Sequence, residues 1–425
     1  MRVLVLGSGG REHALVARLS KDPGVTVLCA PGNPGIAQIA PVHEVDLADP
    51  AAIAALAERQ GVDFTVVGPE LPLSVGVADR FARDGRVLLG PTAAAARLET
   101  SKAFAKAFMA RHRIPTARFH TSESADDALA TVRSGSFGFP VVLKADGLAA
   151  GKGVVIARDL SEAEEAVHAS MTAGRFGRAG ERLVVEECLQ GPEVSYFVLS
   201  DGVRALPLGT AQDHKRIHDD DLGPNTGGMG AFAPSPLIDR DLDARVMREI
   251  VDPVISGMAA EGSPFRGFLY VGLMLTATGP RVIEFNVRLG DPEAQVILPR
   301  IAEPLTPLLI AAAQGSLETT SCALSDATMV GVVLASRGYP ESSESGQLIT
   351  GIGEAEQTGV TVFHAGTAET NGQIVTAGGR VLTVVARGSG FADAIERAYR
   401  GVRAISFSGA QFRTDIGRKA LQPQV

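Results

Sequence analysis

The chain has 425 residues, of which 45% are hydrophobic and 48 are glycine, and its formal net charge is −8. A chain of this length is expected to form about two to four domains. Its negative charge argues against a nucleic-acid or anionic-membrane partner, and no apolar run is long enough to cross a bilayer. The three cysteines are scattered without a metal-binding spacing, so we expect a protein of the reducing cytoplasm.

The first hundred residues alternate between short apolar runs and helical patterns. Strands are expected at residues 3–6, 25–30 and 64–67, and helices at 11–20 and 50–60. This alternation predicts a parallel, doubly wound α/β sheet, whose ligands bind at the carboxyl ends of the strands.

The glycine-rich turn after the first strand does not fit a dinucleotide site. Position 12 is Glu12 instead of glycine, and the second strand runs into Pro31, Gly32 and Asn33 instead of ending in an acid. Gly9 and Gly10 still leave free N–H groups at a helix N-terminus, which suits a single phosphate. A tight turn without a ligand is the alternative.

Residues 92–112 are expected to form one helix that ends before Pro115. Phe104 and Phe108 lie one turn apart and face a core, whereas Lys102 and Lys106 are expected to be solvated. Residues 120–187 then make a compact unit that could close over a nucleotide, with helices at 125–134 and 161–169, a strand at 183–187 and a mobile segment at 172–180.

The centre of that unit is a hairpin formed by residues 141–156. Two β-branched runs flank a loop that contains Gly147, Gly151 and Gly153, with Lys144 and Lys152 beside it. Backbone N–H groups and lysines together suit a polyphosphate. The spacing is not that of a Walker A motif, and a strand follows instead of a helix. A flexible hairpin with solvated lysines is the alternative.

Three further stretches carry groups able to bind ligands. The stretch 186–195 links two strands, and an adenine could lie against it, although two ordinary surface acids would give the same pattern. The charged run 213–216 and the glycine-rich run 224–230 resemble binding loops instead of linkers. The turn at 378–380 is a weaker candidate for ligand contact.

The strand at 281–288 carries the clearest metal-binding pattern. Period two places Glu284, Asn286 and Arg288 on one face, with Ile283 and the apolar residues 285 and 287 toward the core. A carboxylate beside an amide oxygen suits Mg²⁺, and an adjacent arginine can hold a carboxylate or phosphate. Asp291 should then cap a helix that has Pro292 at its first position. The alternative is an amphipathic strand with a wet polar face.

Beyond residue 328 short strands dominate. They are expected at 330–335, 347–349, 360–364, 373–376 and 380–386, followed by a helix at 391–405. This pattern predicts an α+β module that is mostly antiparallel.

Eight stretches, spread in order over the whole chain, resemble those of the glycinamide ribonucleotide synthetase (phosphoribosylamine–glycine ligase) family. They are GSGGREHA at 7–14, VGPE at 67–70, KADGLAAGKGV at 144–154, DHKR at 213–216, GPNTGGMGA at 223–231, EFNVR at 284–288, GDPE at 290–293 and HAGT at 364–367. The resemblance implies the ATP-grasp fold, with a pre-ATP-grasp domain at 1–100, a core at 101–327 that includes a lid at 120–189, and a C-terminal domain at 328–425. Ser8, Thr100, Leu289 and Arg337 depart from the common pattern without removing a charged site group.

The same resemblance implies the activity. The family joins glycine to 5-phosphoribosylamine with ATP and Mg²⁺ or Mn²⁺, through glycyl phosphate, in the second step of purine biosynthesis. A sister ATP-grasp carboxylase and a nucleotide sensor without catalysis are the alternatives. A transient contact with the amidotransferase that makes phosphoribosylamine is also implied.

Site roles follow from the matched motifs. For ATP they are Lys102, Lys144, Gly151, Lys152 and Gly153 at the phosphates, Glu186, Glu187 and Leu189 at adenine and Glu193 at ribose. For metal they are Glu284 and Asn286. For the substrates they are Gly9, Gly10, Pro31, Gly32 and Asn33 at the ribose 5-phosphate, with Glu70, Asp213, Lys215, Arg288 and Gly290. The catalytic residues are Asp213, Arg288 and Lys144.

Overall fold

The computed structural model describes residues 1–147 and 153–422. Its N-terminal unit is a sheet of parallel strands in the order β2-β1-β3-β4, which confirms the doubly wound prediction. The strands are β1 (Arg2–Gly7), β2 (Thr26–Pro31), β3 (Phe64–Val67) and β4 (Val87–Leu89). The helices are α1 (Gly10–Leu19), α2 (Pro34–Ala37), α3 (Pro50–Arg59), α4 (Glu70–Ser74) and α5 (Val77–Arg83). Strand β1 is buried on both faces, because Val3 and Leu4 enter different apolar clusters.

The prediction of a single helix at 92–112 is wrong. Two helices occupy this stretch, α6 (Arg97–Thr100) and α7 (Lys102–Arg111), and Ser101 between them is extended, with φ −136°. The Ser101 hydroxyl accepts a hydrogen bond from the Phe104 amide at 3.1 Å, so a local N-cap outweighs helical continuity. Phe108 is buried as expected, whereas Phe104 stays half-buried under the Arg97 guanidinium.

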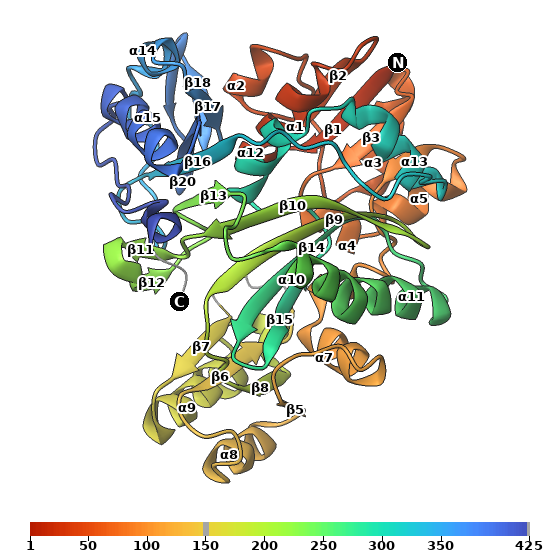
Figure 1. Cartoon of the computed structure of the whole chain (residues 1–425), viewed down its shortest axis with the longest axis vertical. Helices are drawn as coiled ribbons and strands as arrows, with labels where there is room; N and C mark the ends of the chain where they lie inside the picture. Colours follow the sequence, from red (N-terminus) through yellow and green to blue (C-terminus); the bar gives the residue numbers. More distant parts are fainter. Residues whose placement is uncertain (148–152, 423–425) are drawn as a thin grey trace.

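The lid is a separate antiparallel sheet at the bottom of Figure 1, with strand order β5-β8-β6-β7. Its strands are β5 (Phe119–Ser122), β6 (Val141–Ala145), β7 (Val154–Ala157) and β8 (Leu183–Glu187), and its helices are α8 (Ala125–Arg133) and α9 (Leu160–Val167). Strands β6 and β7 pair antiparallel, with Lys144 opposite Val154, which confirms the hairpin. Gly151 and Lys152 at its tip lie outside the described residues. In the stretch 172–180, Gly177–Gly180 forms a 3₁₀ turn.

Eight strands of the described chain form one central sheet, in the order β15-β14-β9-β10-β13-β16-β20-β17. These strands are β9 (Glu193–Asp201), β10 (Ala205–Asp213), β13 (Gly230–Ala233), β14 (Arg266–Thr276), β15 (Gly279–Asn286), β16 (Thr328–Ala335), β17 (Thr361–His364) and β20 (Arg380–Gly388). Strand β13 pairs with β16, so the C-terminal strands extend the same sheet that carries β15. The domain limits given by the resemblance remain a prediction.

Helices and small hairpins surround this sheet (Figure 1). They are α10 (Arg240–Val246), α11 (Asp252–Ala260), α12 (Glu293–Ile297), α13 (Leu305–Gln314), α14 (Ile352–Gln357) and α15 (Phe391–Ala404), with hairpins of β11 (Arg216–His218) and β12 (Leu222–Asn225) and of β18 (Thr367–Thr370) and β19 (Gln373–Thr376). The strand expected at 347–349 is wrong: Leu348 makes only an isolated bridge to Val375. The other expected C-terminal elements are present.

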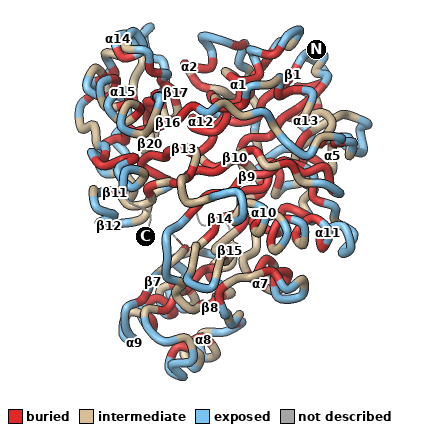
Figure 2. Tube along the Cα trace, viewed as in Figure 1, coloured by how far each residue is buried: buried red, intermediate tan, exposed pale blue. Residues whose placement is uncertain are grey.

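Figure 2 shows the buried interior running along the central sheet, with the exposed residues of the lid at its outer end. No helix in the described ranges is long and apolar enough to cross a membrane.

A β-bulge changes the inward-facing residues of β15. Gly272 of β14 pairs with Glu284, but the next residue, Leu273, pairs with Val282, so Ile283 is the extra residue. Val282 is fully buried and Ile283 is only half-buried. The expectation that Ile283 faces the core is therefore wrong, because strict alternation fails where the bulge inserts a residue.

Candidate functional site

The lid hairpin and strand β15, which carries the candidate metal ligands, meet directly. The Lys144 ammonium on β6 donates to the carbonyl oxygen of Ile283, the bulged residue of β15, at 3.1 Å. The Lys102 ammonium at the start of α7 donates to the carbonyl oxygen of Gly147 at 2.9 Å. The bulge thus provides an acceptor at the joint between the two sheets, one residue before Glu284.

Glu186 lies between two buried lysines. Its carboxylate is 3.0 Å from the Lys144 ammonium and 2.7 Å from the Lys106 ammonium. Burial lowers the pKa of Lys106 to about 8, against the opposing effect of the Glu186 charge. Lys106 also donates to the Thr116 hydroxyl at 2.8 Å. The expectation of a solvated Lys106 is wrong, because tertiary contacts bring a buried carboxylate to it.

Glu187, Leu189 and Glu193 follow at the link between lid and core. Glu187 accepts hydrogen bonds from the Arg118 amide at 2.9 Å and the Arg118 guanidinium at 2.7 Å. Burial acts to raise the pKa of Glu187, but these bonds keep it below its usual value. Leu189 is half-buried, and Glu193 is exposed at the first position of β9.

Glu284 and Asn286 lie half-buried on β15. Burial lowers the pKa of Lys102, and the nearby Glu284 charge opposes that effect. Among the residues that the structure describes, no group of three or more His, Cys, Asp or Glu side chains could hold a metal ion. A carboxylate and an amide oxygen side by side fit a hard cation whose other ligands come from phosphate and water.

Arg288 continues this polar face and is fixed by acids. Its guanidinium lies 2.8 Å from the Glu99 carboxylate and 3.2 Å from the Glu70 carboxylate, and it donates to the Asn286 amide oxygen at 3.5 Å. Burial opposes its charge, but Glu99 and Glu70 keep its pKa above the usual value. Glu99 was not singled out from the sequence, since nothing in its local pattern links it to residue 288.

A second polar group lies at the end of β10, which strands β14 and β9 separate from β15 in the sheet. The Asp213 carboxylate at the end of β10 is 3.0 Å from the Lys215 ammonium, which is 3.4 Å from Glu193. Burial opposes the charge of Lys215, but Asp213 holds its pKa well above the usual value.

Glu293 is a buried acid that the sequence pattern presented only as part of a helix start. It accepts a hydrogen bond from the Ser195 hydroxyl at 3.0 Å. A Cβ at Gly290 would lie 2.4 Å from a Glu293 carboxylate oxygen, so a larger residue there would displace the Glu293 side chain. Burial, followed by the Asp213 charge, raises the pKa of Glu293 to about 7.

The glycine turn of the N-terminal unit is partly occupied by carboxylates. The Gly9 amide donates to Glu12 at 2.6 Å, and the Arg11 amide donates to Asp291 at 3.4 Å. The expectation of a free N–H at Gly9 is wrong, because Glu12 folds back onto it. The expected cap at Asp291 is also wrong: α12 begins at Glu293, and the Asp291 carboxylate accepts from the Gln295 side-chain amide at 2.8 Å and from the Arg11 amide of α1 instead of capping the helix.

Asn33 is held at the edge of this turn. Its amide nitrogen donates to the carbonyl oxygens of Ser8, at 2.8 Å, and His364, at 2.9 Å. Pro31 ends β2, and Gly32 has φ +73°, which a glycine accommodates. The side chain of Asn33 therefore shapes the backbone of the turn and joins it to the C-terminal strand β17.

Arg380 connects the turn at 378–380 to two stretches of the candidate site. Its guanidinium donates to the carbonyl oxygens of Gly227 at 2.7 Å and Asp291 at 2.6 Å. It therefore fastens the glycine-rich loop 224–230 to the stretch that carries Glu293.

A nucleotide lid whose lysine hairpin meets a carboxylate-bearing strand of a second sheet defines an ATP-grasp protein. The biotin carboxylase domain of Hydrogenobacter thermophilus 2-oxoglutarate carboxylase, solved with MgADP and bicarbonate, has this fold: TM-score 0.71, 19% identity, covering 97% of this chain and 91% of that chain.

Models of the phosphoribosylglycinamide synthetase N domain, ATP-grasp (A) domain and C domain match residues 1–99, 100–294 and 329–419. The chain belongs to the phosphoribosylglycinamide synthetase family. It is 50% identical to phosphoribosylamine–glycine ligase of Xylella fastidiosa over 99% of this chain and 98% of that protein. It is 48% identical to that of Vibrio cholerae over 99% of both chains. The crystal structure of the Thermotoga maritima ligase has TM-score 0.86 and 34% identity, covering 98% of this chain and 100% of that chain.

Proposed function

We propose that the chain catalyses the ATP-dependent ligation of glycine to 5-phosphoribosylamine, giving glycinamide ribonucleotide, ADP and phosphate. The observation that carries this proposal is the 3.1 Å contact between the Lys144 ammonium and the Ile283 carbonyl oxygen. It brings the polyphosphate hairpin and the acid–amide face of β15 to one place, as phosphoryl transfer to a carboxylate requires.

The first step phosphorylates glycine. A glycine carboxylate oxygen attacks the γ-phosphorus, the bond to the β-phosphate oxygen breaks, and ADP leaves with that electron pair. Lys102 and Lys144 neutralise charge on the phosphates, and Glu186, 3.0 Å from the Lys144 ammonium, orients Lys144. Gly151, Lys152 and Gly153, in the loop between β6 and β7, cover the phosphates. Glu284 and Asn286 would hold Mg²⁺ or Mn²⁺, which supplies further charge neutralisation when bound.

The second step forms the amide bond. The phosphoribosylamine nitrogen attacks the acyl carbon of glycyl phosphate, a proton leaves that nitrogen, and inorganic phosphate departs. Asp213 orients the amine, and Lys215 holds Asp213 in place at 3.0 Å. Glu293 is a further acid near Asp213: it is buried against the Ser195 hydroxyl at 3.0 Å, and burial, followed by the Asp213 charge, raises its pKa to about 7. Arg288 faces the glycine carboxylate or acyl-phosphate oxygens through the remaining donor of Nη1, because its Nε is held by Glu70 and its Nη2 by Glu99 and Asn286, and Glu70 contributes to the substrate site by holding Arg288.

The remaining subsites follow the exposed groups around these centres. Two lysines already occupy the Glu186 carboxylate. The backbone of residues 187–189 therefore binds the adenine, and Glu193 binds its ribose. The turn with Gly10 and Gly32 accommodates the ribose 5-phosphate beside Asn33, and Gly290 adds a substrate contact next to Glu293. Closure of the lid over 120–189 excludes water from the acyl phosphate. A cytoplasmic location and a transient contact with the amidotransferase complete the proposal.

Phosphate release measured with each substrate omitted in turn tests the function. We expect release only when ATP, the divalent metal, glycine and phosphoribosylamine are all present, with glycinamide ribonucleotide formed in equal amount. Release that requires bicarbonate instead of glycine would establish the carboxylase alternative. Nucleotide binding without release under any of these conditions would establish the sensor alternative.

A further inference from the structure

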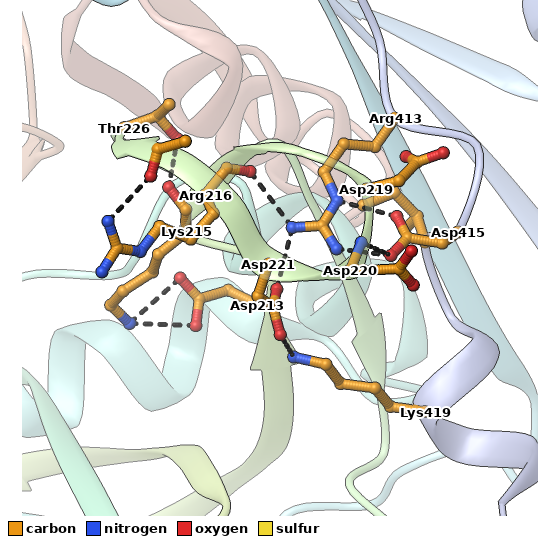
Figure 3. Close-up of polar contacts among 12 residues, drawn as sticks. Asp213, Lys215, Arg216, Asp219, Asp220, Asp221, Thr226, Arg413, Asp415 and Lys419 are labelled. Atoms are coloured by element: carbon orange, nitrogen blue, oxygen red, sulfur yellow. Dashed lines mark hydrogen bonds and ion pairs between the residues drawn. The ribbon is translucent and has the colours of Figure 1, made fainter.

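The C-terminal segment 413–419 makes hydrogen bonds and ion pairs with residues 216–221, in the loop that follows Asp213 (Figure 3). Arg413 is completely buried, and its guanidinium donates to both carboxylate oxygens of Asp415, at 2.7 and 2.6 Å. The remaining nitrogen donates to the Asp221 carboxylate at 2.9 Å and to the carbonyl oxygen of Arg216 at 3.1 Å. One side chain from the end of the chain therefore holds both ends of the segment 216–221.

Residues next to Arg413 in the C-terminal segment make further polar contacts with the loop. The Thr414 amide donates to Asp219 at 2.8 Å, the Asp220 amide donates to Asp415 at 3.0 Å, and the Lys419 ammonium is 2.6 Å from Asp221. Asp220 and Asp221 have φ of 56° and 55°, a left-handed conformation that is unfavourable for non-glycine residues. Hydrogen bonds from the C-terminal segment therefore maintain a loop conformation that the loop would not keep alone.

His214 links this network to the site. Its ring is fully buried, and its amide and carbonyl bond the loop to β13, through Gly230 at 2.9 Å and Met229 at 2.8 Å. Burial, followed by the Lys419 and Arg413 charges, lowers the pKa of His214 to about 4, so the ring is neutral near pH 7. Asp213 and Lys215, on either side of this fixed residue, reach the active site.

We propose that Arg413 is a positioning residue, which sets Asp213 and Lys215 against the amine substrate by holding the backbone at 216 and the loop at 219–221. The inference rests on the proposed function and adds a role for the C-terminal segment. A planar, bidentate donor is needed, because one group must bridge Asp415, Asp221 and a carbonyl oxygen.

Arg413→Lys tests the proposal, with Arg400→Lys as the matched control. Arg400 pairs with Glu396 on the exposed face of α15, with half of each side chain or more exposed. When a group that positions a reactant moves by about 1 Å, the efficiency of the reaction can fall by up to about a hundredfold. We expect the R413K variant to raise the KM for phosphoribosylamine by roughly ten- to a hundredfold, with the KM for ATP within about twofold of wild type. The R400K variant should match wild type in both.

A merely structural role of Arg413 gives a different result. It would lower the melting temperature and the active fraction, and hence kcat, while leaving the KM for phosphoribosylamine unchanged, and that outcome overturns the proposal. If R413K does not fold, Asp221→Asn replaces it, since Asp221 lies on the exposed loop. It should raise the same KM in the same direction.

Hydrogen exchange separates this inference from the proposed function. R413K should accelerate exchange of the amides in 214–225 and leave the lid strands β6 and β8 unchanged. Unchanged exchange in 214–225 overturns the positioning role even if ligation is confirmed. Absence of ligation by the wild-type enzyme, in contrast, overturns the proposed function.

Discussion

Replacing Glu186 by glutamine should loosen the lid. The side chain is 3% exposed and is paired with two lysines that are 3% and 6% exposed. Breaking a buried ion pair by removing one partner costs about 3–5 kcal/mol, because the remaining charge is left uncompensated. Glutamine keeps the shape of the glutamate side chain and one of its hydrogen-bond acceptors. We therefore expect a loss of stability at the lower end of this range, about 3 kcal/mol.

Glu187→Gln is the matched control, one residue further along β8. Its partner Arg118 is 63% exposed, and pairs of this kind contribute about 0–1 kcal/mol. The two variants therefore differ in burial of the pair, while the charge change, residue type and strand are the same.

Hydrogen exchange of the β6 and β8 amides is the direct assay, because it reports local opening of the lid. A loss of about 3 kcal/mol corresponds to exchange roughly a hundredfold faster, since each 1.36 kcal/mol is about tenfold. Equal protection of these amides in the two variants would refute the reasoning that burial makes the Glu186 clamp strong.

Three further outcomes follow from the site. Glu284→Ala should abolish ligation while leaving the melting temperature and lid exchange at wild-type values; turnover at the wild-type rate with magnesium present would refute the metal assignment. Lys144→Ala should weaken ATP binding about ten- to a hundredfold in calorimetry, as expected for a lost charge-assisted bond, and an unchanged affinity would count against the hairpin. Glu293→Gln should change the pH dependence of stability. The folded pKa of about 7 lies above the ordinary 4.5, so the wild-type unfolding free energy should fall relative to the variant as pH rises between these values, by about 3 kcal/mol in total. Parallel stability curves for the two proteins would contradict the buried, protonated state.

Local sequence patterns anticipated most of the elements. The hairpin at 141–156 needs only two β-branched runs around a small-residue loop, and the parallel N-terminal sheet follows from alternating strands and helices. Secondary-structure propensity and hydrophobic periodicity depend on residues that are neighbours in sequence. The local pattern alone is therefore enough to predict these elements. The stretches 144–154, 213–216 and 284–288 supplied the candidate site residues, whose roles stay predictions, and the structure brings Lys144 of the first stretch to the Ile283 carbonyl oxygen, directly before the third.

Local patterns failed where a partner distant in sequence competes with the local signal. The pairing of β14 with β15 creates the bulge at Ile283, and the Ser101 cap and the Asp146 carboxylate at 3.1 Å from the Ala103 amide split the helix at 92–112. Lys106 looked like an ordinary surface lysine because its burial depends on Glu186, 80 residues later.

The sequence by itself determined the type of most local elements and the residue types that the candidate site offers. Only the tertiary structure decided that β16, β20 and β17 continue the sheet that carries Glu284, that two lysines share Glu186, and that Arg413 holds the Asp213 loop. The reason is that a buried charge is stable only beside its partner, and the chain acquires that partner when segments far apart in sequence pack together.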